Sequence, residues 1–221
     1  MKLKLIVFAL IALYTLLIVY DLAAPYYITD YNIPVHERCD RRVTIIDVYS
    51  ELDDLNTSYC LLHGLSLDEL RSLGSINSSV IFIVTHAFGE GKSIAIGTSD
   101  RNVFRVVIMH PITSIIGLST GVLSNGSKFI AADWRALMIS RSLSNKTIVI
   151  VSCGGSSLVW IAREMIKHGA STVICACWSK MPCSMAREIV KQLIRAYRVS
   201  GVKGLVAMAR TWGFKVITSR R

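Results

Sequence analysis

The sequence predicts one α/β domain with a mostly parallel central sheet between two helical layers, plus an N-terminal membrane helix. Short apolar runs rich in β-branched residues alternate with amphipathic helical patterns along most of the chain, and this order is typical of a parallel sheet covered on both faces. With 221 residues, the chain can build one such domain and a short appendage, but not two substantial cores. We therefore expect a single functional site.

The first 24 residues are expected to form the membrane helix. Residues 5–20 are apolar apart from one Thr and two Tyr, follow Lys2 and Lys4, and end at Asp21. This length lies between that of a signal-peptide core and that of an ideal spanning helix. The segment therefore meets a membrane, either as an anchor or as a signal peptide.

The residues that follow this segment favour an uncleaved anchor. Cleavage after Ala24 would need a small residue at Leu22 and would leave Pro25 directly after the cut, and both are unfavourable. The lysines before the segment and the acidic residues after it orient the rest of the chain out of the cytoplasm. We expect a single-pass protein of the cell membrane with an extracytoplasmic domain, or a secreted protein if the segment is cleaved.

The polar residues 25–42 are expected to connect this helix to a domain that spans residues 43–221. Strands are expected at 43–48, 80–85, 147–151 and 172–177, with two further strand-like pieces at 93–96 and 104–109. Helices are expected after the capping box of Ser66 and Glu69, and at 158–166 and 186–197.

The composition argues against several kinds of partner. The net charge is +10, but Lys and Arg are scattered rather than interleaved with aromatic residues, so we expect no nucleic acid partner. Cys175, Cys177 and Cys183 lack the C-x-x-C spacing of metal sites, and we interpret them as buried apolar residues. No metal or organic cofactor is expected.

Cys39 and Cys60 could form a disulfide. Four of the six Asn residues begin the N-x-Ser/Thr pattern of N-glycosylation sites.

Two of the expected strands end in residues that can form a catalytic dyad. His86 follows the strand at 80–85, and Cys153 follows the strand at 147–151. In open α/β sheets the functional crevice lies at the carboxyl ends of the strands, so these residues meet if the two strands are neighbours. The glycines 154–155 lead into a helix whose N-terminus would favour a thiolate.

Such a dyad predicts nucleophilic chemistry. Cys153 would attack a carbonyl group, and His86 would act as its base and then protonate the leaving amine. The backbone N–H groups of Ala87 and Cys153 are expected to form an oxyanion hole. The opposing interpretation is that one His and one Cys fall at strand ends by chance, because buried cysteines are common in protein cores.

Two stretches of sequence resemble a known family. They read SSVIFIVTHAFGEG and, later, FIAADWRALMISRSLSNKTIVIVSCGGSSLVWIAREMIKHGASTVICACWS. They resemble the caspase-like cysteine peptidases, most closely the CHAT-domain branch, from about residue 80 to 178 and more weakly to 212. This resemblance implies a caspase-hemoglobinase fold, with His86 as base and Cys153 as nucleophile. It also implies that the strand ending in Trp178 borders the substrate cleft, so Trp178 and Ser179 are candidate pocket residues; the alternative is that Trp178 packs in the core.

Two positions depart from the family pattern. Ala87 stands where relatives usually have Gly, and residues 181–183 lack the acidic residue often found in that region. These departures favour, as an alternative, a non-catalytic domain that serves as a surface sensor or adaptor. A nucleotide site at glycines 154–155 is a weaker alternative, because the complete glycine-rich motifs are missing. The sequence therefore predicts a membrane-anchored cysteine endopeptidase that acts on proteins or peptides.

Overall fold

The computed structural model describes residues 2–27, 40–48, 52, 59–88, 93–97, 106, 108–122, 128–139, 142–153, 158–176 and 183–219. The helices are α1 (Lys2–Tyr27), α2 (Leu67–Arg71), α4 (Pro111–Gly117), α5 (Val159–Lys167) and α6 (Cys183–Thr211), with 3-10 turns η3 (Leu73–Ser75) and η4 (Trp134–Ile139). The strands are β1 (Asp40–Asp47), β2 (Tyr59–Leu62), β3 (Val80–Phe88), β4 (Ser93–Gly97), β5 (Leu118–Val122), β6 (Lys128–Asp133), β7 (Thr147–Cys153), β8 (Thr172–Cys175) and β9 (Lys215–Thr218). The predicted α/β class is confirmed.

A mixed sheet joins the nine strands of the described residues. Strands β2, β1, β3, β7 and β8 lie side by side in that order and are parallel, and β9 pairs antiparallel with β8 at the edge. Strands β4, β6 and β5 form an antiparallel extension that begins at the carboxyl end of β3. The parallel part of the sheet is thus continuous with an antiparallel part at the end of one central strand.

The prediction of a mostly parallel sheet is wrong. Among the described residues, four of the eight strand pairings are antiparallel. The sequence patterns also predict no strand at β2, β5, β6 or β9. Ser, Thr and Gly interrupt the apolar residues of β5, and β9 is half exposed. The strand expected at 104–109 is also wrong, since Val106, Ile108 and Met109 are helical.

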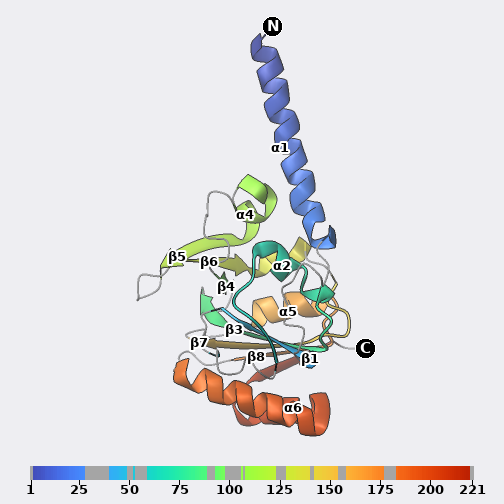
Figure 1. Ribbon diagram of the computed structural model, residues 1–221, viewed down its shortest axis with the longest axis vertical. Coiled ribbons are helices and arrows are strands. Elements are labelled where there is room, and N and C mark those ends of the chain that lie inside the picture. The colour runs from blue at the N-terminus through green and yellow to red at the C-terminus, as the bar shows by residue number, and fades with distance from the viewer. Residues whose placement is uncertain are drawn as a thin grey trace.

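The central strands are buried on both faces. In β3, Ile81 and Ile83 face a core that includes α5 and α2, whereas Val80, Phe82 and Val84 face a second core that includes α6. Figure 1 shows α5 on one side of the sheet and α6 on the other. Because successive residues of a strand point to opposite faces, a continuous apolar run is what a strand between two helical layers requires.

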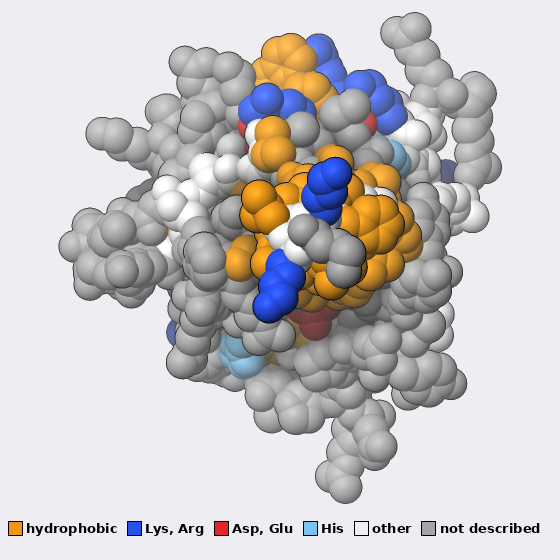
Figure 2. All heavy atoms as spheres, turned by 90° about the horizontal axis from the view of Figure 1, so that it is seen from above, with side chains coloured by type: hydrophobic (Ala, Val, Ile, Leu, Met, Phe, Trp, Pro, Cys, Tyr) orange, Lys and Arg blue, Asp and Glu red, His pale blue; other side chains and the backbone are white. Residues whose placement is uncertain are grey.

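Helix α1 extends away from this domain (Figure 1). Residues Lys2–Ala23 are long and apolar enough to cross a membrane by length and composition. Most large apolar side chains of α1 are exposed, and within the described residues the helix contacts the domain mainly through α2 and α4. Figure 2, seen from the side of α1, shows these apolar side chains together with groups of Lys and Arg. A long exposed apolar helix of this kind is the form that a membrane anchor takes.

We expect Phe82→Ala to destabilise the domain by about 3–5 kcal/mol, because it leaves a cavity against α6. Phe82 is fully buried in the middle of β3. Denaturant unfolding of the full chain in detergent, followed by tryptophan fluorescence, measures the loss. The matched control is Val199→Ala on α6, where the side chain is 80% exposed and little change is expected. Equal effects at the two positions would contradict the two-sided burial of β3.

Candidate functional site

Strands β3 and β7 bring the two predicted dyad residues to adjacent positions. Their parallel register runs without a shift from the pair Val80–Thr147 to the pair His86–Cys153. Neighbouring strands lie about 4.8 Å apart, so His86 and Cys153 are side by side at the carboxyl end of the sheet. The dyad required these two strands to be neighbours, and the register confirms that they are.

His86 lies where β3 changes partners. Up to Val84, β3 pairs with β1 on one side and with β7 on the other, and beyond His86 its last two residues pair with β4. The hydroxyl of Thr85 donates a 2.6 Å hydrogen bond to the carbonyl oxygen of Ala95 in β4. This contact ties the start of the antiparallel extension to the end of β3. The side chain of His86 is partly exposed, so solvent or a substrate can reach it.

The other predicted site residues are described only in part. Ala87 is buried and pairs with Ile94, so it belongs to the β3–β4 ladder. Trp178 and Ser179 lie outside the described residues, as do the glycines 154–155. The positions of the dyad are therefore given by the structure, whereas the substrate pocket stays a prediction.

Several other described Cys and His residues are buried, disulfide-bonded or paired with an acidic side chain. Cys175 is buried in β8, and Cys60 is disulfide-bonded; Cys39, the partner considered for it, lies outside the described residues. His168 follows α5, with Nε2 3.3 Å from Oε1 of Glu164. Within the described residues, no group of three or more His, Cys, Asp or Glu side chains could hold a metal ion.

A histidine and a cysteine at adjacent main-chain positions are compatible with an activated thiol nucleophile. At the carboxyl end of the sheet this pair could form a thioester with a carbonyl substrate and then hydrolyse it. No family model matches the chain, and no match was found among the curated proteins.

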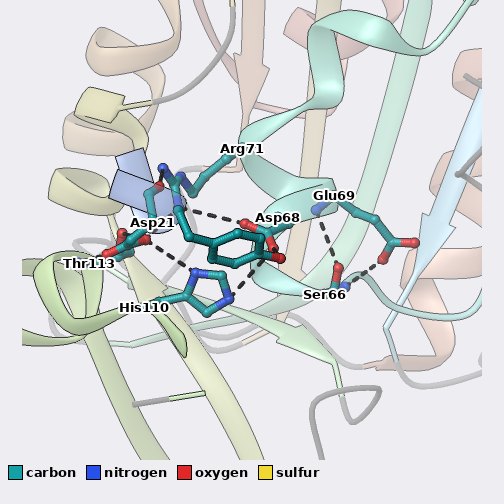
Figure 3. Close-up of polar contacts among 8 residues, drawn as sticks. Asp21, Ser66, Asp68, Glu69, Arg71, His110 and Thr113 are labelled. Atoms are coloured by element: carbon teal, nitrogen blue, oxygen red, sulfur yellow. Dashed lines mark hydrogen bonds and ion pairs between the residues drawn. The ribbon is translucent and has the colours of Figure 1, made fainter. Parts of the chain in front are cut away.

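A second polar cluster, which we call the Asp21 cluster, joins the end of α1 to the domain (Figure 3). It comprises Tyr20, Asp21, Asp68, Arg71, His110 and Thr113. Arg71 Nη1 donates to Asp21 Oδ1 at 2.8 Å, and Arg71 Nη2 donates to the Asp21 carbonyl oxygen. Thr113 donates from its backbone N–H to Oδ2 and from its hydroxyl to Oδ1, both at 2.9 Å. The carboxylate of Asp21 is thus fully buried and held from two elements.

His110 links the two acidic residues of this cluster. Its Nδ1 lies 3.1 Å from Asp21 Oδ1, and its Nε2 lies 3.5 Å from Asp68 Oδ2. Asp68 also accepts a 3.4 Å hydrogen bond from the Tyr20 hydroxyl. Burial raises the pKa of the Asp68 carboxyl, although His110 and Arg71 act in the opposite direction. The cluster therefore connects α1, α2 and the start of α4 through one shared set of charges.

The sequence predicts the helix that carries two residues of this cluster, but it does not predict which residues they contact. The predicted capping box is present, with Ser66 N–H donating to Glu69 Oε2 at 2.6 Å, and it starts the helix that carries Asp68 and Arg71 (Figure 3). Nothing local shows that Asp21 is their partner, because it lies 50 residues from Arg71. A charge directly after an apolar segment indicates only where that segment ends.

We expect Asp21→Ala to lower the free energy of unfolding by about 3 kcal/mol, because the buried Arg71 would lose its nearer carboxylate and keep only that of Asp68, 3.6 Å away. Thermal or denaturant unfolding of the full chain in detergent measures this loss. Glu188→Ala is a suitable control, since Glu188 accepts its hydrogen bond from Gln192 on the exposed face of α6. An unfolding free energy that Asp21→Ala leaves unchanged would show that the cluster does not hold α1 to the domain.

Proposed function

We propose that this protein is a membrane-anchored cysteine endopeptidase of the caspase-like superfamily, closest to the CHAT-domain peptidases. The observation that carries this proposal is the register that pairs His86 with Cys153 at the carboxyl ends of β3 and β7. The resemblance of the sequence assigns base and nucleophile to these same two residues. The register of the strands and the sequence resemblance thus support the same pair of residues as the proposed dyad.

The reaction would proceed through an acyl-enzyme. His86 takes the proton of the Cys153 thiol, and the thiolate adds to the carbonyl carbon of the peptide bond. The oxyanion would be stabilised by the backbone N–H groups of Ala87 and Cys153. The C–N bond then breaks as the imidazolium protonates the leaving amine. Water, deprotonated by His86, hydrolyses the thioester and releases the carboxylic acid and the thiol.

The surroundings of the dyad support this chemistry. The carboxyl ends of parallel strands are where open α/β sheets bind ligands, and β3 and β7 both end there. The buried strands on either side hold the main chain of both residues. Trp178 and Ser179 are proposed to border the cleft for a protein or peptide substrate. The chemistry needs no metal or organic cofactor.

We also propose that α1 anchors the domain on the outer side of the cell membrane. The length and apolar character of α1 support a span, and the lysines that precede it favour the cytoplasm. The disulfide of Cys60 supports an oxidising compartment for the domain.

Ala87 favours one alternative, a non-catalytic sensor or adaptor domain. This residue replaces the usual Gly of the family and is buried in the β3–β4 ladder. A Cβ at this position narrows the approach of a carbonyl group to the backbone N–H. Peptide hydrolysis that depends on Cys153 would exclude this alternative.

We expect an electrophilic peptide probe to label Cys153 in the full-length protein. Acyloxymethyl ketones that carry Arg, Lys or Asp next to the ketone would be tested in detergent, and the modified cysteine would be mapped by mass spectrometry. Loss of the base in His86→Ala should slow labelling by about 10²–10⁴-fold. The buried Cys175 should stay unmodified, which gives a control within the same chain.

His168→Ala is the matched histidine control, because His168 contacts Glu164 at the end of α5 and should leave the labelling rate unchanged. Circular dichroism of each variant would verify the fold. If His86→Ala labels as fast as the original chain, the dyad is wrong. If no probe labels Cys153, the adaptor alternative is favoured.

A further inference from the structure

We propose that α4 makes a second membrane contact and inserts its exposed isoleucine side chains into the lipid bilayer beside α1. This inference rests on the membrane anchoring by α1 that forms part of the proposed function. It is independent of whether Cys153 is catalytic.

The Asp21 cluster sets the position of α4 along α1. The backbone N–H and the hydroxyl of Thr113, in the first turn of α4, both donate to the Asp21 carboxylate. Asp21 is the first charged residue after the apolar segment 5–20. The first turn of α4 is therefore fixed at the level where that apolar segment ends (Figure 3).

Helix α4 lies between α1 and the domain, because it contacts α1 on one side and η4 and β6 on the other. Figure 1 shows α4 beside the lower part of α1, further toward the N-terminal end of α1 than the sheet and α5. The two helices are in contact. A bilayer that surrounds α1 would consequently meet α4 as well.

The side chains on this surface suit lipid. Ile115 of α4 is 78% exposed and Ile108, just before α4, is 41% exposed. The sequence of α4, PITSIIG, contains no charged residue. Large apolar side chains exposed beside an anchor suit a membrane contact.

The charges next to α4 are shielded from lipid. The side chains of Asp21 and Arg71 are fully buried, and His110 is nearly so. The ring of Tyr20 lies 6.0 Å from that of His110, and Tyr is a residue that membrane interfaces favour.

A second contact would limit how the domain moves on the membrane. A single helix leaves the domain able to rotate about the helix axis, whereas α1 and α4 together define one orientation. The side of the sheet that carries α5 then faces the membrane, and α6 faces away from it (Figure 1).

The test is lipid photocrosslinking of the full chain in liposomes of phosphatidylcholine and phosphatidylglycerol. The photoreactive residue p-benzoylphenylalanine would replace Ile115 or, in a second variant, Ile108. Position 13 in α1 is the positive control, and position 199, where Val199 is 80% exposed on α6, is the negative control. Lipid adducts would be measured by mass spectrometry. We expect adducts at positions 108 and 115 roughly tenfold above those at 199, since only inserted side chains contact acyl chains.

The possible outcomes separate this inference from the proposed function. Adducts at position 13 but at neither 108 nor 115 would overturn the α4 contact and leave the anchor standing. Lipid adducts at none of the three positions would overturn the anchor and the α4 contact together. Protein–protein crosslinks at 115 in place of lipid adducts would identify α4 as a surface for a second copy, and would also overturn the proposal. None of these readouts depends on peptidase activity.

Discussion

The candidate site depends on the parallel pairing of β3 with β7. This ladder is continuous from the pair Val80–Thr147 to the pair His86–Cys153, and both strands are packed between two cores. A shift of one residue in the register of β3 would turn the side chains that face α6 toward α5, and those that face α5 toward α6. It would also separate His86 from its partner. The packing that stabilises the sheet therefore holds His86 and Cys153, the candidate dyad, in register.

The antiparallel extension holds the main chain of β3 just beyond the candidate site. Strand β4 pairs with the last residues of β3, and the hydroxyl of Thr85 is bonded to it. As a result, His86 lies between the parallel ladder and the antiparallel one. Its neighbour Ala87 is held in the second ladder. A main chain fixed on both sides is the kind of support that a catalytic group needs if it is to keep one orientation.

The Asp21 cluster is a separate constraint that concerns the membrane. Its buried carboxylate accepts hydrogen bonds from Arg71 and Thr113 and lies beside His110. A buried ion pair adds little net stability compared with an apolar contact, but it is costly to break and it fixes geometry. The cluster therefore does more to orient α1 and α4 than to stabilise the domain. The Asp21 cluster lies on the α1 side of the sheet (Figure 1), so the proposed attachment and the proposed chemistry use different parts of the fold.

The sequence by itself determined the α/β class, the apolar N-terminal helix, the central strands and the capping box of α2. These features depend on residues that are close together in the chain, and the periodicity of 2 or 3.6 residues records which faces are buried. It also indicated His86 and Cys153, because both directly follow apolar runs. Only the tertiary structure decided that β3 and β7 are neighbours, that half of the strand pairings among the described residues are antiparallel, and that Asp21 is buried. The partners of Asp21 lie 50 to 92 residues away, and local periodicity shows that a face is buried without showing what covers it.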